Sequence, residues 1–389
     1  MTRQNLDRVD QLLKPVTLPH LSDYPLVSVL TPSYNYAHYL PEAIDSVLAQ
    51  TYPHFEMVIC DDGSSDESCA IIQRYVRRDP RIKLLRKDNG GATSALNAAY
   101  FESSGQVVCL LDADDRYLPT KLETVVRGFQ AHSNSGFLGH RMFRIDADGR
   151  RCGVTSILDE HPSGWYGPFM VRYGDIPGLA ITSGLCLRRE ISDLLFPQPE
   201  RFGNFGEAAI TALAPLMTPL IGTPEPLAEY RCHGSNDSNG RLTLKTVDRQ
   251  VEIHKMKREL QKEFLRSVHP DLAYVFPGFD HRSGFLLSTY IHARLQVKGE
   301  TRGAFHNLVR SESFHTLHPA IRLFWFLSVL LPRPIFRHAL DWIWGPGRLK
   351  ALAWQVTRYW TEGKFPTVRA KKYTKLTGHP TNLDRPALR

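Results

Sequence analysis

The sequence lacks the cysteine pattern of a disulfide-stabilised or zinc-binding domain. Its 389 residues contain six cysteines, none of them in a Cys-x-x-Cys pair. Several, such as Cys60 and Cys109, lie in apolar stretches typical of strands. Scattered cysteines of this kind are usually small buried apolar residues in a reducing compartment. We therefore expect all six thiols to be free.

Long apolar runs are also missing. The strongest one, within residues 322–331, covers only about nine residues, whereas a helix that spans a bilayer needs about 20. Residues Met1 to Leu18 are polar, of mixed charge, and without an apolar core or a small-residue cleavage site. We expect neither a transmembrane helix nor a secretory signal.

Acidic residues become scarce in the second part of the chain. Residues 1–240 hold 22 lysines and arginines against 29 acidic residues, a net charge of −7, and residues 241–389 hold 26 against 11, a net charge of +15. An acidic amino-terminal part and a basic carboxyl-terminal part indicate two functional regions. Such a basic segment suits nucleic acid, an anionic membrane surface or plain water. No nucleic-acid recognition motif accompanies the charge, so we expect no nucleic-acid partner.

The first part of the chain alternates between strand and helix patterns. Expected strands cover residues 26–31, 55–60, 81–85 and 106–111, with helices over 38–50, 67–77 and 92–102 between them. This alternation predicts an α/β fold with a Rossmann-like, mostly parallel sheet flanked by helices. A helix over 119–130, a hairpin of 136–145 with 151–157, and a strand within 181–188 follow, while 158–180 is expected to be loop and the apolar run 208–222 is ambiguous.

Three carboxylates end the apolar run from Val107 to Leu111: Asp112, Asp114 and Asp115. Charged groups at the carboxyl end of such a strand lie at the sheet edge where open α/β sheets bind ligands. If the backbone stays extended through Asp114, Asp112 and Asp114 point to the same side. Two such carboxylates suit Mg²⁺ or Mn²⁺ together with substrate phosphates. A solvated acidic turn is the alternative for an isolated Asp-x-Asp.

The neighbouring motifs make residues 25–130, with weaker support to about 238, resemble the family 2 glycosyltransferases of the GT-A fold. The motifs are Val27–Asn35, Ser46–Tyr52, Asp61–Asp66, Asn89–Asn97 and Leu110–Asp115. Each is weak alone, but five in this order across about ninety residues are specific. The resemblance implies a nucleotide-sugar donor, a saccharide or lipid-linked acceptor, a divalent cation (Mn²⁺ or Mg²⁺) and inversion at the anomeric carbon.

The resemblance also implies roles for individual residues. Asp112 is expected on the ribose side of the donor and at the metal, and Asp114 at the metal, with Asp115 supporting either or capping the next segment. Asp62 takes the position that hydrogen-bonds uracil in members that use uridine, although guanine and thymine present N–H donors as well. A helix-capping turn is its alternative. Four further residues of the loops are expected to contact the nucleotide sugar: Pro32, Tyr34, Asn35 and Asn89.

The acceptor hydroxyl needs a base, and here the sequence departs from the family. Glu207 matches the glutamate of the usual Glu-Asp pair, but Ala208 stands in the aspartate position. Asp175 or Glu200 could substitute, or catalysis could be impaired. In the Tyr230–His233 stretch, the resemblance implies a diphosphate contact by Arg231 and a metal or phosphate contact by His233.

The resemblance does not cover residues 241–389. Their aromatic stretches, such as Phe324–Phe326, Trp342–Trp344, Trp354 and Tyr359–Trp360, alternate with basic residues. This pattern is typical of a helix on an anionic membrane surface, and equally of a helical subdomain. We expect a cytoplasmic protein that binds the inner face of the membrane peripherally.

The expected organisation is a leader over 1–24, a GT-A domain over 25–240 divided near residue 118, a helical basic region over 241–370 and a disordered tail over 371–389. Two other functions stay open. The chain could be a non-catalytic nucleotide-sugar-binding or scaffold homologue that has lost its base, or a nucleotidyltransferase. The second would favour a Gly-rich phosphate loop, which Pro32–Asn35 lacks.

Overall fold

The computed structural model divides the chain into two compact units. One consists of Lys14–Gly167 and Ile176–His233, and the other of Met1–Leu13, Pro168–Asp175 and Gly234–Arg389. The structure describes residues 9, 11–155, 162–174, 176, 179, 181–233, 244–275, 283–296, 301–310, 314 and 319–344. The domain limits expected near residues 24 and 240 stay predictions. The expected disordered tail, Trp354 and Tyr359–Trp360 lie outside the described residues.

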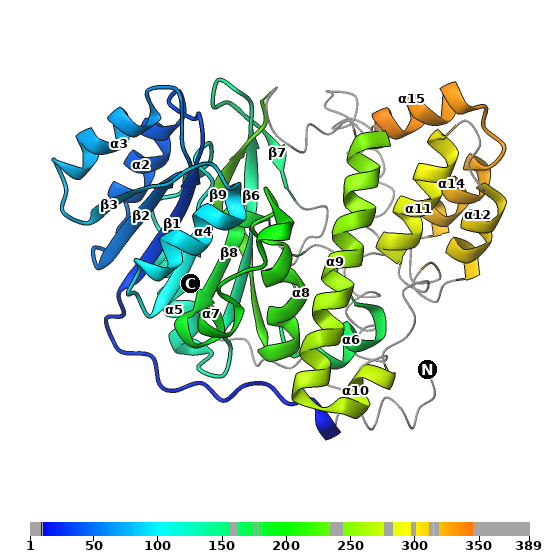
Figure 1. Ribbon diagram of the computed structural model, residues 1–389, viewed down its shortest axis with the longest axis horizontal. Coiled ribbons are helices and arrows are strands. Elements are labelled where there is room, and N and C mark those ends of the chain that lie inside the picture. Colours follow the sequence, from blue (N-terminus) through cyan, green and yellow to red (C-terminus); the bar gives the residue numbers. More distant parts are fainter. Residues whose placement is uncertain are drawn as a thin grey trace. The chain divides into compact units, whose positions relative to one another are not determined.

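The first unit is built on four parallel strands in the order β3-β2-β1-β4. These strands are β1 (Val27–Ser33), β2 (Phe55–Asp61), β3 (Ile82–Arg86) and β4 (Val107–Leu110). All residues of β1, β2 and β4 are buried, as expected for a sheet with helices on both faces. The expected parallel α/β sheet is confirmed (Figure 1).

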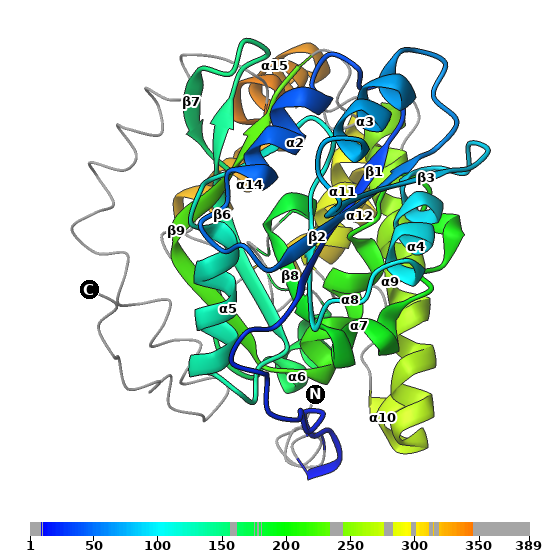
Figure 2. The ribbon, with the colours of Figure 1, turned by 90° about the vertical axis from the view of Figure 1, so that its left-hand side faces the viewer.

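Three helices make the crossovers between these strands: α2 (Leu40–Leu48), α3 (Ser68–Val76) and α4 (Ala92–Phe101). In α2 the buried residues are Leu40, Ala43, Ile44 and Val47, which form one helical face. The strand order reverses after β3, and right-handed crossovers then require α4 to cover the opposite face from α2. Figure 2 shows α2 and α4 on the two sides of the strands.

The sheet continues beyond β4 with strands from the later part of the unit. β8 (Leu185–Arg188) pairs antiparallel with β4, followed by β6 (Phe137–Ile145), β9 (Leu220–Arg231) and β5 (Arg116–Tyr117). β7 (Arg151–Val154) pairs antiparallel with β6, which confirms the expected hairpin. Helices α5 (Lys121–Ala131), α7 (Arg189–Leu195) and α8 (Ala208–Met217) complete this half, together with the 3₁₀ turns η1 (Thr182–Gly184) and η2 (Glu200–Phe202).

Two segments differ from the sequence expectations. Residues 158–180 were expected to be loop, yet Gly167–Tyr173 form helix α6. The ambiguous run 208–222 is divided between α8 and the start of β9. All ten residues of α8 are buried, so this helix has no polar face that periodicity could reveal.

The second unit is helical in its described part, as the sequence spacing predicts. Besides α6 it contains α9 (Leu244–Val268), α10 (Pro270–Val275), α11 (Ser283–Leu295), α12 (Thr301–Arg310), α14 (Pro319–Ser328) and α15 (Arg333–Trp344). Its apolar core includes Tyr290, Phe314, Trp325 and Phe336. Among the described helices, none is both long enough and apolar enough to cross a bilayer.

Glu56 of β2 gives a test of how the amino-terminal sheet edge is held. Its side chain is 7% exposed and accepts hydrogen bonds from Ser28 Oγ (2.7 Å), the Ser104 N–H (2.6 Å) and Lys83 Nζ (2.7 Å). Burial raises the pKa of Glu56, but the bonds from Lys83, Ser104 and Ser28 outweigh it and bring the pKa below its ordinary 4.5. The stabilisation is therefore present above that value and is lost as the pH falls through the folded-state pKa.

We expect Glu56→Gln to lower the unfolding free energy by about 1–3 kcal/mol at neutral pH, because a neutral amide loses the charged hydrogen bonds. The deficit relative to wild type should shrink as the pH falls. Urea unfolding at several pH values measures both effects, with the exposed Glu67→Gln as control. Equal stability of Glu56→Gln and wild type at neutral pH would contradict this account.

Candidate active site

The loops that follow β1 and β2 meet at the carboxyl edge of the sheet. Asn35 has a positive φ of 57°, and its side-chain oxygen accepts hydrogen bonds from the N–H groups of Ser65 (2.8 Å) and Asp66 (3.3 Å). Asparagine tolerates this left-handed conformation better than most residues. Tyr34 is 46% exposed beside it. Pro32, expected in the loop, is the penultimate residue of β1 and pairs with Cys60 of β2.

Asp62 fixes the loop that leads into α4. Its Oδ1 accepts hydrogen bonds from Lys87 Nζ (2.8 Å) and the Gly90 N–H (3.0 Å), and its Oδ2 accepts from the N–H groups of Gly90 (3.1 Å) and Gly91 (2.7 Å). A carboxylate has about four acceptor positions. Three donors make four contacts here, because the Gly90 N–H is shared between both oxygens, so a nucleobase N–H would have to compete with these donors. The base contact of Asp62 stays a prediction, as does the donor contact of the exposed Asn89.

The acidic motif after β4 forms a turn. The strand ends at Leu110, and the N–H of Asp115 donates to the carbonyl of Asp112 (3.1 Å). The condition that the backbone stays extended through Asp114 is therefore not met, since this i to i+3 bond closes a turn. Asp114 is 5% exposed and Asp115 is fully buried, so the alternative of a solvated acidic turn does not describe them.

The surroundings of the turn disfavour the ionised forms of two of its carboxyl groups, Asp112 and Asp115. Burial raises the pKa of Asp112, and the charges of Asp114 and Glu207 raise it further, while a hydrogen bond from Thr182 lowers it. Burial also raises the pKa of Asp115, with Asp114 and Asp112 adding to the effect. Removal from water and like charges both disfavour the ionised form. A cation bound at this turn would favour the ionised carboxylates and so offset the unfavourable effects of burial and of the like charges.

Arg231, at the end of β9, holds the acidic turn from the side. Its backbone N–H donates to Asp115 Oδ1 (2.9 Å), its Nε to the Asp114 carbonyl (2.9 Å) and its Nη2 to Glu42 Oε2 (2.7 Å). The side chain is 1% exposed. In this arrangement the guanidinium binds the Asp114 carbonyl and Glu42. Its expected contact with a diphosphate stays a prediction.

His233 lies directly against the turn. Its Nε2 is 2.9 Å from Asp114 Oδ2, and its ring centroid lies 4.9 Å from that of Tyr39 and 6.2 Å from that of Tyr36. The structure thus brings together His233 and Asp114, two of the three residues expected at a metal, although they are 119 positions apart in the sequence. Sequence reasoning missed the two tyrosines that confine the ring.

Glu207 stands at the beginning of α8, half-buried, and its charge acts on Asp112. Its Oε2 accepts a hydrogen bond from the hydroxyl of Thr182 (3.3 Å). Of the alternative bases, Glu200 accepts a hydrogen bond from Ser94 Oγ (3.0 Å), and Asp175 lies outside the described residues. The expected base is therefore placed at the acidic turn, with its catalytic role a prediction.

Sequence reasoning missed a second set of residues that position the turn. The N–H of Asp112 donates to Ser183 Oγ (2.9 Å), and the Ser183 carbonyl accepts from Nζ of the fully buried Lys121 (2.7 Å). Glu42 accepts from both Arg231 and Arg116. A lysine in the buried stripe of α5 is the one sequence signal that could have indicated this, because lysine is rarely buried without a partner.

The turn can accept a divalent cation only with help from a ligand. Within the described residues, no group of three or more His, Cys, Asp or Glu side chains is arranged to hold a metal by itself. Mg²⁺ commonly takes one or two carboxylates and completes its shell with substrate phosphates and water. Asp114 and Asp112, whose pKa is raised by burial and by the charges of Asp114 and Glu207, fit that mode of binding.

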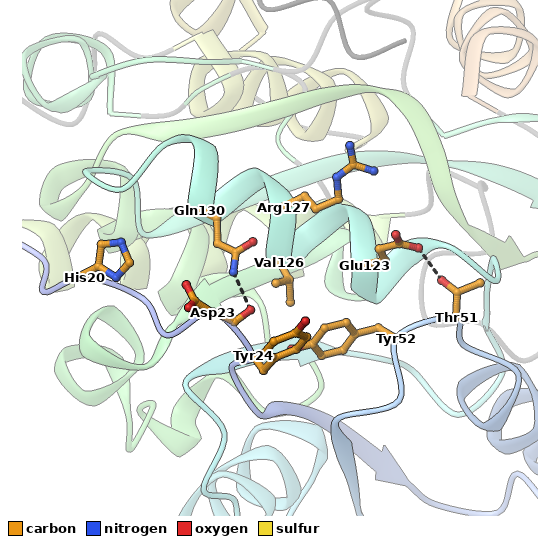
Figure 3. A pocket seen from close by; sticks show the side chains of 9 residues that line it. All are labelled: His20, Asp23, Tyr24, Thr51, Tyr52, Glu123, Val126, Arg127 and Gln130. Atoms are coloured by element: carbon orange, nitrogen blue, oxygen red, sulfur yellow. Dashed lines mark hydrogen bonds between the residues drawn. The ribbon is translucent and has the colours of Figure 1, made fainter.

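A surface pocket of about 690 Å³ lies elsewhere in the unit. Figure 3 shows that α5 and the segments preceding β1 and β2 form it, with Tyr24, Tyr52, Glu123 and Arg127 in its wall. This position is at the amino ends of the parallel strands, opposite the edge that carries Asp112. The pocket contains none of the expected site residues.

Comparison with known proteins assigns a part of the chain to a family. The family model for glycosyl transferase family 2 matches residues 28–193. These residues form a family 2 glycosyltransferase domain. The resemblance inferred from the sequence motifs is confirmed. The matched span contains Asp62, Asp112 and Asp114 and ends before Glu207 and Arg231.

Curated relatives of this glycosyltransferase domain match part of the chain. An uncharacterized glycosyltransferase of Nostoc sp. strain PCC 7120 is 35% identical over 213 residues, which are 54% of this chain and 66% of the relative. TuaG of Bacillus subtilis strain 168, a putative teichuronic acid biosynthesis glycosyltransferase, is 45% identical over 124 residues, 31% of this chain and 49% of the relative. The chain therefore spans less than two thirds of the length of each.

The crystal structure of S. aureus TarS resembles this chain in fold. It has a TM-score of 0.50 and 18% identity, with 81% of this chain and 53% of that chain covered. At this identity the likeness concerns the fold alone. It agrees with the GT-A architecture expected from the sequence.

We expect Arg231→Lys to lower the unfolding free energy by about 2–3 kcal/mol, because one ammonium cannot replace the diverging bonds to Asp114 and Glu42. Urea unfolding of the whole chain measures this. Arg150→Gln is the control, since Arg150 is 79% exposed and pairs only at the surface with Asp148, a kind of pair worth at most about 1 kcal/mol. A lysine variant as stable as wild type would show that the turn does not depend on these bonds.

Proposed function

We propose that this chain transfers a sugar from a nucleoside diphosphate sugar, with uridine as the nucleoside, to a hydroxyl group of a saccharide or lipid-linked saccharide. The supporting observation is that Asp114 and Glu207 lie near enough to Asp112 for their charges, together with burial, to raise its pKa. One small region thus holds two carboxylates suited to a cation and diphosphate and a third suited to a base. The family 2 domain supports the reaction class.

The proposal assigns a role in donor and cation binding to each of the following residues. Asp112 and Asp114 bind the ribose side of the donor and a divalent cation, while Tyr34, Asn35, Asp62 and Asn89 line the path of the nucleotide. When bound, the cation supplies positive charge opposite the leaving diphosphate. Arg231 and His233 keep the turn and the Asp114 carboxylate in place.

Glu207 accepts the proton of the acceptor hydroxyl in this proposal. The hydroxyl oxygen attacks the anomeric carbon from the face opposite the diphosphate. The new C–O bond forms as the bond from that carbon to the diphosphate oxygen breaks, and the electron pair of the broken bond leaves on the diphosphate. The configuration at carbon is thereby inverted. A carboxylate base must lie within hydrogen-bond reach of the hydroxyl.

We further propose a role in cell-surface polysaccharide synthesis on the cytoplasmic side of the membrane. The name of the B. subtilis relative supports the pathway class. The six cysteines are free, which agrees with a reducing compartment. A non-catalytic nucleotide-sugar-binding homologue is the second candidate, because Ala208 replaces the second acid of the usual pair. The family match gives no support to a nucleotidyltransferase.

The base assignment predicts a specific kinetic effect. Glu207→Gln should lower kcat for transfer by about 10²- to 10⁴-fold, because the amide cannot accept the proton, while donor affinity stays within about twofold. Glu200→Gln should retain turnover, since Glu200 already binds Ser94. Transfer assays and donor-binding calorimetry on the same preparations measure both quantities.

Full turnover of Glu207→Gln would remove Glu207 from the base role. Loss of turnover in Glu200→Gln instead would assign the role to Glu200. A wild-type chain that binds a donor and transfers to none of the offered saccharides or lipid-linked acceptors would favour the non-catalytic candidate.

The cation assignment predicts that donor binding depends on metal. Calorimetry with a panel of uridine, guanosine and thymidine diphosphate sugars, each with Mn²⁺, Mg²⁺ or EDTA, should find one donor that binds only with metal. Asp114→Asn should lose that binding, because the amide carries no charge for the cation. Asp148→Asn, at an exposed turn, should bind as wild type does. Equal binding with EDTA would contradict the assignment.

A further inference from the structure

Cys109 and Cys186 lie opposite each other on neighbouring strands. Cys109 of β4 is the register partner of Cys186 of β8 in an antiparallel pair. Both side chains are fully buried and belong to the same apolar core. The Cys109 thiol donates a hydrogen bond to the Cys186 sulfur. Two thiols in direct contact are therefore enclosed within the sheet, and the proposed sugar transfer uses neither of them.

The backbone hydrogen bonds define the geometry of this pair. The Arg189 N–H donates to the Gln106 carbonyl (2.9 Å), which makes these two residues a hydrogen-bonded pair of the β4–β8 ladder. Hydrogen-bonded and non-hydrogen-bonded pairs alternate along antiparallel strands. Cys109 and Cys186, three positions further along the ladder, are therefore a non-hydrogen-bonded pair.

This type of pair suits a disulfide. Non-hydrogen-bonded partners have Cα atoms about 4.5 Å apart and side chains that lie close together. Disulfides connect Cα atoms about 4.4–6.8 Å apart. The two sulfurs can therefore bond by rotation of the side chains, without a shift of either strand. Cys60 of β2 is equally buried, but its register partners are Pro32 and Leu85.

The fully buried Lys121 places a positive charge near this pair, and that charge acts on both sulfurs. Burial raises the pKa of the Cys186 thiol, but the hydrogen bond from Cys109 and the charge of Lys121 outweigh it and bring the pKa below its ordinary 9.0. For Cys60, burial and the charge of Asp62 raise the pKa to about 12. Since the thiolate is the form that reacts with oxidants, Cys186 is the sulfur that we expect to react first.

We propose that Cys109 and Cys186 are a site of reversible oxidation, at which a hydroperoxide converts the two thiols into a disulfide between β4 and β8. The Cys186 thiolate attacks an oxygen of the peroxide, the O–O bond breaks, and Cys186 becomes a sulfenic acid. The hydroxide that leaves from hydrogen peroxide takes up the proton that Cys186 released. The Cys109 sulfur then attacks the sulfenic sulfur, the S–S bond forms, and the hydroxyl group leaves as water with the Cys109 proton. Two electrons pass from the thiols to the peroxide, and a dithiol reductant reverses the change.

The disulfide would join the two strands that lead to and from the acidic turn and its support. Cys109 precedes Asp112 by three residues, and Cys186 follows Ser183 by three. The Asp112 N–H donates to Ser183 Oγ (2.9 Å), so the joined strands carry both partners of a contact that positions the turn. Disulfides in reducing compartments, where present, are usually transient and redox-sensing. The oxidation itself does not depend on sugar transfer.

Peptide mapping of the full chain by mass spectrometry tests the proposal. The reduced protein is treated with hydrogen peroxide at neutral pH without denaturant and is then digested without reduction. We expect a linked peptide that contains Cys109 and Cys186, and its disappearance after dithiothreitol. Because both thiols are buried, peroxide reaches them through local opening, so the link should accumulate slowly. The urea midpoint of the oxidised chain should rise by about 1 M, because the cross-link constrains the unfolded state.

Three alanine variants assign the steps. Cys109→Ala should stop at a sulfenic acid on Cys186, which dimedone traps, and Cys186→Ala should leave Cys109 a thiol. Cys60→Ala is the matched control, because Cys60 is as buried as the pair, and it should form the link as wild type does. Circular dichroism confirms that each variant is folded, and the map of the wild-type chain decides the proposal even where a variant does not fold.

A folded wild-type chain in which Cys109 and Cys186 both stay thiols after peroxide treatment would overturn the proposal. Linked peptides that pair either residue with Cys60 would overturn it as well, because they would show that the reaction takes place in unfolded chains.

Discussion

Three carboxylates within four residues, at the end of a fully buried strand, impose the main physical constraint on this structure. Like charges a few ångströms apart repel one another strongly where water is excluded. Burial raises the pKa values of Asp112 and Asp115, and the neighbouring negative charges raise them further. Groups from distant segments keep the turn folded. The N–H and guanidinium of Arg231 and the hydroxyl of Thr182 donate hydrogen bonds to it, and the hydroxyl oxygen of Ser183 accepts one from the Asp112 N–H.

This constraint links the two halves of the glycosyltransferase unit. Arg231 ends β9, and the η1 turn that contains Ser183 precedes β8, so strands of the second half hold a motif that belongs to the first. Lys121 supports Ser183 in turn. The guanidinium of Arg231 is already bonded to Asp114 and Glu42. In the proposed reaction, the charge of the leaving diphosphate would therefore be met mainly by a cation at Asp112 and Asp114.

The parallel sheet and the grouping of its loops could be predicted from the sequence, because buried strands and amphipathic helices leave regular patterns. Asp112 and Asp114 could be found because they follow such a strand directly. The turn at Ala113–Asp114 could not, since strand periodicity says nothing about the residue where pairing stops. The burial of Arg231 could not be predicted from the sequence either, because its partners Glu42 and Asp114 lie 189 and 117 positions away. Helix α8 was ambiguous because every residue in it is buried.

The central claim is that the acidic turn binds a divalent cation together with a nucleoside diphosphate. Anomalous diffraction at the manganese edge, from crystals grown with Mn²⁺ and uridine diphosphate, tests it most directly. The account predicts one strong peak within coordination distance of the Asp114 carboxylate and of diphosphate oxygens. A bound nucleotide with no anomalous peak beside Asp114, or a peak held by other residues, would contradict it.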